Sequence, residues 1–486
     1  MELKRIVENI KPLEVLNFKN TEIIGLSYNS QTIKSHEIFV CLKGEHVDGH
    51  DFAQMAFEKG AAALVVERPL NIEIPQLVVE STKIAIADLA DCFYRSPSKS
   101  LNLIGVTGTN GKTSVTHLIQ KIMEINEQKC AIIGTLGYKL HSKGDYFEAK
   151  HTTPQAPELQ ATLDKILSNE IDNVVMEVSS HSLAQYRVKN CVFKGAVFTN
   201  LTQDHLDYHI TMDNYFESKA KLFSELEDGS FAVINIDDVW GDKFVGATSN
   251  KAKITTYGIK NVADVMAKNI EFRADGAKFL CQTKNKSLEI KLHLNGLFSV
   301  YNALAAIATA LDMGIELEVI KFALESTKGV AGRFEIVHLN PMVVVDYAHT
   351  PDGLDNILRA ARELVPDGGE LISLFGCGGD RDATKRPKMG KIAQELSDKI
   401  IITSDNPRSE DPKQIISDVL SGLKEINPKT VFVEADRGDA IKLLKKISTE
   451  NDVLVVAGKG HEDYQILKDK TIHFDDREEV NKVFGE

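Results

Sequence analysis

The pattern of strand, glycine-rich loop and helix around residues 103–123 constrains the fold more than any other feature. The apolar run Leu103-Ile-Gly-Val106 leads into Thr107-Gly-Thr-Asn-Gly-Lys-Thr113, and an amphipathic pattern follows at 115–123. A helix that begins directly after such a loop offers free backbone N–H groups and the positive end of its dipole to a phosphate. Lys112 then reaches the β- and γ-phosphates of a nucleotide, and the Thr113 hydroxyl binds Mg²⁺. A purely structural turn is the alternative, because Val106 stands where the strict motif has glycine.

The length of the chain requires more than one hydrophobic core. A chain of 486 residues is expected to form two to four domains. Two polar, turn-prone stretches, 94–100 and 326–332, divide it into residues 1–98, 99–329 and 330–486. Each part alternates short apolar runs with helical patterns, which predicts an α/β fold. The expected strands are 37–42 and 61–67 in the first part, 103–106, 173–178 and 195–199 in the second, and 342–345, 371–375, 400–403 and 453–457 in the third.

Composition narrows the classes of protein. The formal net charge of −13 argues against a partner that is a nucleic acid, since binding one needs clustered Lys and Arg. The six cysteines are scattered without a C-x-x-C pair, which favours free thiols in a reducing compartment. No run approaches roughly 18 consecutive apolar residues, and the start of the chain lacks the apolar core of a signal peptide. We therefore expect a cytoplasmic protein with no membrane-spanning helix.

The four expected strands of the third part all run into polar or glycine-rich loops, at 346–351, 376–381, 404–408 and 458–462. Ligands of open parallel sheets bind outside the carboxyl ends of the strands. The four loops are therefore expected to form one composite binding surface. Four ordinary turns are the alternative.

Two residues that follow the phosphate loop are candidate Mg²⁺ ligands. Glu177 ends an apolar run, and a carboxylate at a strand end that faces a phosphate loop suits Mg²⁺. His205, in the polar segment 199–209, is a candidate second ligand. Taken alone, each residue is also compatible with an ordinary polar position at a strand end or on the surface.

Lys219 interrupts an apolar helical stripe. Helical spacing places it among Tyr215, Phe216, Leu222 and Phe223. A partly buried lysine is pushed toward its neutral amine, which reacts with CO₂ to give an anionic carbamate that can bind a metal. The alternative is a lysine whose aliphatic stem lies along the stripe while its ammonium reaches water.

These motifs resemble those of the Mur ligase family, which builds the peptide of bacterial cell walls, and the resemblance covers essentially the whole chain. The segments that carry it are 107–113, 151–154 (His-Thr-Thr-Pro), 177–181 (Glu-Val-Ser-Ser-His), 200–207, 329–334, 346–351 and 458–462 (Gly-Lys-Gly-His-Glu). The resemblance implies three α/β domains: an N-terminal uridine-nucleotide-binding domain, a central P-loop domain with a parallel sheet, and a Rossmann-like C-terminal domain.

The resemblance also implies roles for individual residues. The implied Mg²⁺ ligands are Thr113, Glu177, His205 and a carbamylated Lys219. The implied catalytic residues are Lys112, Glu177, His205 and Lys219. The ATP site comprises Gly108, Thr109, Asn110, Gly111, Lys112, Thr113, Ser114, Asn302, Arg333 and Asp346. The UDP-N-acetylmuramoyl-dipeptide site comprises Ser30, Thr152, Thr153, Ser179, Gln185 and Arg187. The pocket for the incoming amino acid comprises Arg381, Asp405, Asn406, Pro407, Arg408, Gly458 and Glu462.

Asp405-Asn-Pro-Arg408 matches the branch of the family that adds meso-2,6-diaminopimelate rather than lysine. Diaminopimelate carries a second carboxylate, which can form a bidentate pair with Arg408; an arginine in a surface salt bridge is the alternative. One departure concerns the first domain, where Asn29-Ser30-Gln31 replaces the usual Asp-Ser-Arg. The loss of both charges leaves the details of uridine recognition open.

The implied reaction has two steps and three small-molecule substrates. The D-glutamate γ-carboxylate of UDP-N-acetylmuramoyl-L-alanyl-D-glutamate attacks ATP to give an acyl phosphate, and the diaminopimelate amine then displaces phosphate. This reaction would serve peptidoglycan synthesis, and with it cell shape and division, in an enzyme expected to be monomeric. The alternatives are the same chemistry with L-lysine, a folylpolyglutamate synthase of the same superfamily, and a nucleotide-dependent switch that hydrolyses ATP without ligation. Arg408 and the His-Thr-Thr-Pro segment argue against the synthase.

Overall fold

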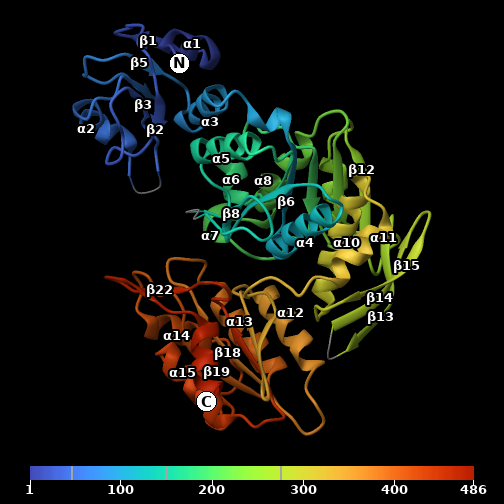
Figure 1. The fold of residues 1–486 in the computed structure, drawn as a ribbon. Coiled ribbons are helices and arrows are strands. Elements are labelled where there is room, and N and C mark those ends of the chain that lie inside the picture. The colour runs from blue at the N-terminus through green and yellow to red at the C-terminus, as the bar shows by residue number, and fades with distance from the viewer. Residues whose placement is uncertain (45–46, 148–150, 274–275, 486) are drawn as a thin grey trace.

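The computed structural model describes residues 1–44, 47–147, 151–273 and 276–485. Along the chain it forms three α/β domains, each built on its own main sheet (Figure 1). The expectation of three α/β domains is confirmed, whereas the exact boundaries at 98/99 and 329/330 remain predictions. Within the described ranges, no helix is both long and apolar enough to cross a bilayer.

The N-terminal domain is a small sheet with helices on its faces. The five strands lie in the order β1-β5-β4-β3-β2, and only β1 runs antiparallel to its neighbour. Its elements are α1 (Leu3–Ile10), β1 (Glu14–Leu16), β2 (Gly25–Ser27), β3 (Glu37–Val40), η1 (Gly49–Phe52), α2 (Ala53–Glu58), β4 (Ala63–Val66), β5 (Gln76–Val78) and α3 (Thr82–Phe93). The short helix η2 (Pro97–Ser100) leads into the next domain.

The central domain is built on ten strands in the order β15-β14-β13-β12-β11-β10-β6-β9-β7-β8. In this sheet order, the strands from β13 to β7 pair in parallel. Strands β8, β14 and β15 extend the two edges in antiparallel pairing, which the sequence did not predict. The strands are β6 (Asn102–Thr107), β7 (Cys130–Gly134), β8 (Gly137–Lys139), β9 (Asn173–Glu177), β10 (Gly195–Phe198), β11 (Phe231–Asn235), β12 (Lys253–Gly258), β13 (Val265–Arg273), β14 (Gly276–Thr283) and β15 (Ser287–Leu292). The helices are α4 (Lys112–Ile125), α5 (Ala156–Ser168), α6 (Ser180–Ala184), α7 (Leu206–His209), α8 (Met212–Ser224), α9 (Gly241–Ala247), α10 (Leu297–Asp312) and α11 (Leu317–Glu325).

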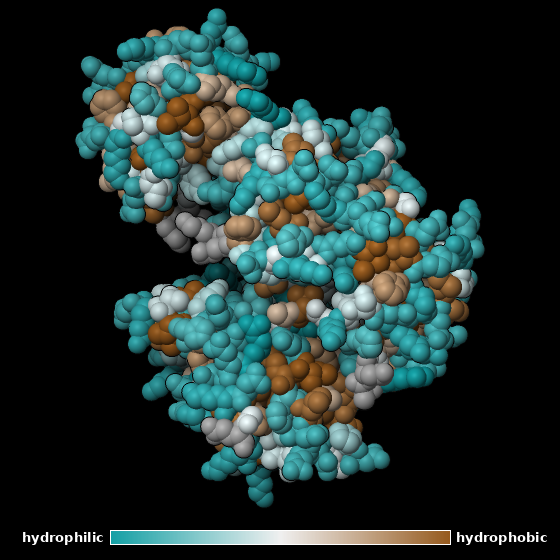
Figure 2. Space-filling view, in the orientation of Figure 1, coloured by the Kyte–Doolittle hydropathy of each residue, from teal (hydrophilic) through white to brown (hydrophobic). Residues whose placement is uncertain are grey.

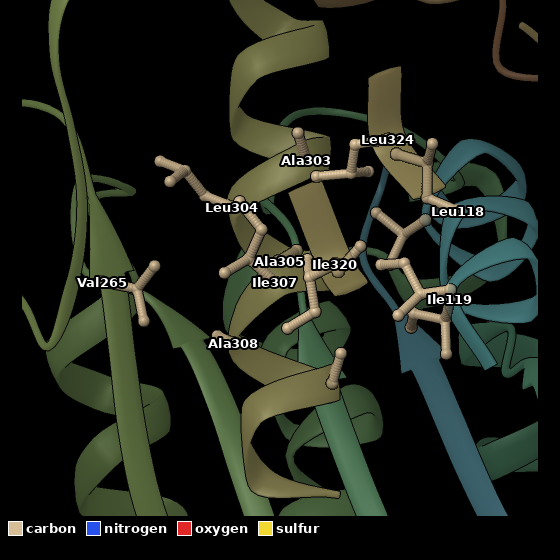
Figure 3. Close-up of a cluster of buried hydrophobic side chains, with 14 of the residues drawn as sticks. Leu118, Ile119, Val265, Ala303, Leu304, Ala305, Ile307, Ala308, Ile320 and Leu324 are labelled. Atoms are coloured by element: carbon tan, nitrogen blue, oxygen red, sulfur yellow. The ribbon is translucent and has the colours of Figure 1, made fainter. Parts of the chain in front are cut away.

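Apolar helices cover both faces of the central sheet. On one face, α10 and α11 pack with α4, and Figure 3 shows part of this cluster, in which Leu304 of α10 lies among Leu118 of α4, Ile320 of α11 and Val265 of β13. On the other face, α5 and α8 contribute a second buried cluster that includes Leu163. Burial of apolar surface on both faces of the sheet fixes the positions of the strands, and thereby the positions of the loops at their ends.

The C-terminal domain has a six-stranded sheet in the order β16-β17-β21-β18-β19-β20, parallel except for β16. The strands are β16 (Glu335–Leu339), β17 (Met342–Asp346), β18 (Leu371–Cys377), β19 (Lys399–Ser404), β20 (Val431–Val433) and β21 (Val453–Ala457), and a separate hairpin is formed by β22 (Tyr464–Ile466) and β23 (Thr471–His473). The helices are α12 (Pro351–Arg362), α13 (Lys385–Leu396), α14 (Pro412–Leu420), α15 (Arg437–Ile447) and α16 (Asp476–Phe484).

Continuous apolar runs become central strands because the C-terminal sheet is covered on both faces. In β17, Val344 enters one buried cluster, whereas Val343 and Val345 enter the cluster on the opposite face. Successive side chains of a strand point to opposite faces, so a strand covered on both sides needs apolar residues at every position. All the strands expected from such runs are confirmed, with ends that differ by a few residues.

Candidate active site

The glycine-rich loop at residues 108–111 connects β6 to α4, as predicted. Gly108 and Gly111 have φ angles of 153° and 87°, in the region that favours glycine. A Cβ atom on Gly108 would lie 1.9 Å from Oγ1 of Thr199, and one on Gly111 would lie 2.4 Å from Oδ1 of Asn302. The loop therefore needs glycine at both positions.

Lys112 lies over the loop that precedes it. Its Nζ donates to the carbonyl oxygens of Gly108 (2.9 Å) and Thr109 (2.8 Å). Burial lowers the pKa of Lys112, although the charges of Glu177 and Asp204 oppose this effect. Arg333 approaches the same helix start from a distant part of the chain, where its Nη2 donates to Oγ1 of Thr113 at 3.1 Å.

Glu177 lies at the end of β9, beside the glycine-rich loop. The register of parallel strands β6 and β9 places Val106 opposite Glu177, so both strands end at the same edge of the sheet. The side chain is 1% exposed. Oε1 accepts from Thr113 Oγ1 and from the Thr135 backbone N–H, and Oε2 accepts from Thr135 Oγ1, each at 3.0 Å. Thr135 was missed by the sequence reading.

Lys219 is buried rather than extended to water, so the alternative of a solvent-reaching ammonium is wrong. The residue is 1% exposed, and its Nζ donates to the Gly108 carbonyl oxygen at 2.9 Å. It also lies 4.8 Å from the ring centre of Tyr215. Burial, and next the charge of Lys112, hold the pKa of Lys219 well below its usual value. The Lys219 amine therefore lies against the phosphate loop.

His205 follows β10 with a left-handed backbone, φ 54°. Its Nε2 lies 3.3 Å from Oδ2 of Asp204, and its ring meets the edge of the His181 ring at 4.7 Å between centroids. Burial lowers the pKa of His205 to about 3, so the imidazole is neutral near pH 7. Within the described residues, no three His, Cys, Asp or Glu side chains gather as a metal cage.

One cleft of about 1320 Å³ brings together the phosphate loop and the C-terminal loops. Figure 2 shows the surface hollowed above the C-terminal domain. The predicted site residues that line the cleft are Thr109, Asn110, Gly111, Lys112, Thr113, Ser114, Thr152, Glu177, Ser179, His205, Asn302, Arg333, Asp346, Arg381, Asp405, Asn406, Arg408, Gly458 and Glu462. Those outside its described lining are Ser30, Gly108, Thr153, Gln185, Arg187, Lys219 and Pro407.

The composite surface predicted at the carboxyl ends of the C-terminal strands is confirmed, since all four loops contribute to this lining. Asp346, at the end of β17, accepts from the backbone N–H groups of Phe334 and Ala348, each at 2.7 Å. Burial raises its pKa, and the nearby Arg333 opposes this. The Arg333 guanidinium stacks on the Tyr347 ring at 4.4 Å. These contacts hold Arg333 between the two domains.

The loop 405–408 and Glu462 form one hydrogen-bonded group. Asn406 donates to Oε2 of Glu462 at 2.9 Å and accepts from the Ile466 backbone N–H at 2.8 Å. Arg408 donates through Nη1 to the carbonyl oxygens of Gly379 (2.8 Å) and Asn406 (3.3 Å). Burial, and next the charge of Asp405, raise the pKa of Glu462.

Sequence reasoning missed two buried cations that support this group. Lys459 is fully buried, and its Nζ lies 3.2 Å from Oε2 of Glu462. Arg437 forms a fully buried pair with Asp476, and its Nη2 donates to the Ala457 carbonyl oxygen at 2.9 Å, directly before Gly458. Lys459 stands within a quoted motif, whereas nothing local in the sequence identifies the pairing of Arg437 with Asp476.

The residues predicted for the uridine substrate lie together in the central domain, apart from Ser30. Thr153 Oγ1 accepts from the Ser179 backbone N–H at 3.0 Å, and Arg187 Nη1 donates to the Thr153 carbonyl oxygen at 3.0 Å. Arg187 also donates through Nε to Oε1 of Gln185 at 3.1 Å. Ser30 belongs to the N-terminal domain, which approaches this region where the hydroxyl of Tyr28 donates to Glu158 at 2.7 Å.

Comparison with known proteins identifies the family. The descriptions "Mur ligase family, catalytic domain", "Mur ligase middle domain" and "Mur ligase, glutamate ligase domain" match residues 22–94, 106–310 and 332–460. The chain is 46% identical to a UDP-N-acetylmuramoyl-L-alanyl-D-glutamate–2,6-diaminopimelate ligase of Clostridium botulinum, over 98% of this chain and 99% of that protein. A ligase of the same name from Bacillus cereus is 43% identical, over 98% and 97% of the two chains.

A solved structure of a ligase with this name supports the same assignment. It is 32% identical, aligns with a TM-score of 0.68, and covers 99% of this chain and 98% of its own. The resemblance first seen in the motifs is thereby confirmed across all three domains. The chain belongs to the Mur ligase family.

Proposed function

We propose that the protein is an ATP-dependent ligase that joins meso-2,6-diaminopimelate to the D-glutamate γ-carboxylate of UDP-N-acetylmuramoyl-L-alanyl-D-glutamate in peptidoglycan synthesis. The observation that carries this proposal is the shared cleft, in which the phosphate loop of one domain faces the loop 405–408 of another. The relatives matched over nearly the whole chain carry the name of this activity.

The reaction requires that two anionic groups meet. In the first step, a γ-carboxylate oxygen attacks the γ-phosphorus of ATP, the bond to the β-phosphate oxygen breaks, and ADP leaves. In the second step, the diaminopimelate amine attacks the acyl carbon of the acyl phosphate, loses a proton, and phosphate leaves. The backbone N–H groups of the loop, Lys112 and Arg333 supply positive charge on the side of the phosphates. Enclosure between two domains shields the acyl phosphate from water.

The nucleotide site that we propose retains all the residues expected from the motifs. Gly108 to Ser114 form the loop and the first turn of α4. Asn302 lies beside Gly111, Arg333 contacts Thr113, and Asp346 orders the backbone next to Arg333. Nucleotide phosphates would take the place of the carbonyl oxygens that Lys112 now contacts.

The residues next to the loop fit Mg²⁺. This ion prefers oxygen ligands and is commonly held by one or two carboxylates together with substrate phosphates. The Glu177 carboxylate and the Thr113 hydroxyl lie 3.0 Å apart in the cleft, and His205 lines the same space. When bound, Mg²⁺ would neutralise charge on the transferring phosphoryl group.

Lys219 is proposed to carry a carbamate. Its burial and lowered pKa favour the neutral amine that attacks CO₂, forming a C–N bond and releasing a proton. The product is an anion next to Gly108, beside the proposed metal. The modification would also place a negative charge near Lys112, where the Lys219 amine now lies.

The two acceptor sites are proposed on either side of the phosphate loop. Thr152, Thr153, Ser179, Gln185, Arg187 and Ser30 are assigned to the UDP-linked dipeptide, and Arg381, Asp405 to Arg408, Gly458 and Glu462 to diaminopimelate. Because a single chain supplies residues for all three substrates, we propose a monomer. Because ATP is consumed, we propose that it works in the cytoplasm.

The decisive experiment is a product analysis. The pure protein is incubated with ATP, Mg²⁺ and UDP-N-acetylmuramoyl-L-alanyl-D-glutamate, and either diaminopimelate or L-lysine is added. Mass spectrometry is expected to detect the diaminopimelate adduct, with phosphate release that requires both acceptors. Equal incorporation of lysine would contradict the specificity, and phosphate release without either acceptor would indicate a nucleotide-dependent switch instead.

A further inference from the structure

Three side chains connect the C-terminal domain to the proposed metal site. Nζ of Lys385, the first residue of α13, lies 3.7 Å from Oδ1 of Asp204. Oδ2 of Asp204 lies 3.3 Å from Nε2 of His205, and Oδ1 also accepts from the His205 backbone N–H at 3.0 Å. The side chains of Lys385 and Asp204 are 7% and 6% exposed, so this pair between domains is shielded from water.

Lys385 occupies a position that is unfavourable without a partner from the central domain. A cation at a helix N-terminus is repelled by the positive end of the dipole, and burial removes its hydration. Among the ion pairs of the described residues, Lys385 has Asp204 as its one acidic partner. The two buried side chains of opposite charge therefore meet where the two domains contact each other.

The residue before Asp204 binds the same turn of α13. Nε2 of Gln203 donates to Oγ1 of Thr384 at 3.1 Å, and Nζ of Lys388 donates to Oε1 of Gln203. Thr384 and Lys388 are four residues apart and share one face of the helix. The segment 203–205 is thus held by α13, and these contacts exist only while the C-terminal domain is docked.

The Asp204 carboxylate lies 3.3 Å from Nε2 of His205 and therefore favours a hydrogen on that ring nitrogen. A neutral imidazole that donates from Nε2 keeps its lone pair on Nδ1. Histidines that bind metals commonly donate their other ring N–H to a carboxylate, which fixes the tautomer and the ring orientation. The left-handed backbone of His205, φ 54°, is costly for a residue with a Cβ and is held by the bond from its N–H to the same carboxylate.

We propose that Lys385, acting through Asp204, is a positioning residue that orients His205 for Mg²⁺, so that docking of the C-terminal domain completes the metal site. This inference rests on the proposed function, because it assumes that His205 is a Mg²⁺ ligand. It assigns no contact with substrate to Lys385.

Metal binding without turnover tests the proposal. Mn²⁺, as a substitute for Mg²⁺, is titrated into the full-length protein with saturating ADP and followed by electron paramagnetic resonance. Lys385→Met and Asp204→Asn are expected to weaken Mn²⁺ binding about tenfold or more, the usual effect of losing such a support. Lys385→Arg, which keeps the charge, is expected to retain most of the affinity. Lys391→Met, an exposed lysine of the same helix, is the matched control and should bind as the wild type does.

The tautomer of His205 gives a second readout, in the metal-free protein. Long-range ¹H–¹⁵N spectra of histidine-labelled protein, with His205→Gln for assignment, are expected to show the Nε2–H tautomer in the wild type and a mixture in Asp204→Asn. Wild-type Mn²⁺ affinity in a folded Lys385→Met variant, or an Nδ1–H tautomer in the wild type, would overturn the inference. Neither readout needs ligation, so failure of the proposed reaction is recognised separately, by the product analysis.

Discussion

Arg408 offers the sharpest quantitative test of the proposed amino-acid substrate. Its Nη1 is occupied by the carbonyl oxygens of Gly379 and Asn406. In the part of the chain that the structure describes, no acceptor receives a hydrogen bond from Nε or Nη2 of Arg408. That edge of the guanidinium presents two parallel N–H groups, the geometry that matches both oxygens of a carboxylate. Diaminopimelate has such a carboxylate on its distal end, and lysine does not.

The magnitude follows from these two free donors. A hydrogen bond between charged groups contributes about 1.5–3 kcal/mol, so two bonds contribute about 3–6 kcal/mol. At about 1.4 kcal/mol for each factor of ten, Arg408→Met should lower kcat/KM for diaminopimelate about 10²- to 10⁴-fold. Burial, and next the charge of Arg381, lower the pKa of Arg408. Lysine has no distal carboxylate to pair with Arg408, so Arg408→Met should not lower kcat/KM for lysine.

The assay measures phosphate release at varied diaminopimelate or lysine, with ATP and the UDP-linked dipeptide saturating. Arg359→Met is the matched control, because Arg359 is an exposed arginine on α12 that pairs only with Asp355 in the described residues. Its kcat/KM values should equal those of the wild type. An equal fall for both amino acids in Arg408→Met, or no fall for diaminopimelate, would refute the assignment of Arg408 to the distal carboxylate.

Three further results are expected. Lys219→Ala should lower kcat at least about 100-fold, because the proposed carbamate next to the metal is removed. A short added carboxylic acid should partly restore turnover, and unchanged turnover in the variant would exclude the carbamate. His461 should make the stability of the fold sensitive to acid. Burial lowers its pKa from 6.5 to about 3, so the unfolded chain binds a proton at a higher pH than the folded chain does. The free energy of unfolding should therefore fall as the pH drops below 6.5, by about 2 kcal/mol at pH 5. Urea unfolding at both pH values should show this loss in the wild type and less of it in His461→Gln. Asp476→Asn should destabilise the fold by about 3–5 kcal/mol, because Arg437 is left buried without its anion, and a change below 1 kcal/mol in the same assay would contradict this.

Local patterns correctly predicted nine of the described strands. Runs such as 342–345 and 453–457 became neighbouring strands because helices cover both faces of the sheet. The antiparallel strands β14 and β15 were missed, since their alternating, half-exposed residues give a weaker signal than a continuous apolar run. Motif order identified the family, but it did not predict how the ten-stranded sheet is extended at its edges.

The candidate site was predictable where its chemistry is local and unpredictable where partners are distant. The glycine-rich loop and Glu177 follow from short segments, whereas the apolar stripe around Lys219 left open whether its ammonium is buried or reaches water. Thr135, which holds Glu177, and Asp476, which pairs with Arg437, come from separate elements and meet their partners only in the folded chain. A hydrogen-bonding partner outside a motif leaves no periodic or compositional signal in a single sequence, so such residues were found only from the structure.

The hydrogen bonds of Lys112 and Glu177 explain how the site can be stable before substrates bind. A buried ammonium or carboxylate without partners would be costly. Lys112 is satisfied by two carbonyl oxygens of its own loop, and Glu177 by two threonines. In the proposed site, phosphate would engage the Lys112 ammonium and Mg²⁺ would engage the Glu177 carboxylate. If the proposed site is correct, nucleotide binding is an exchange of partners within a formed loop rather than the folding of a new one. The glycines at 108 and 111 leave no space for a Cβ, so Gly108→Ala would displace the loop and should weaken nucleotide binding even where the fold is retained.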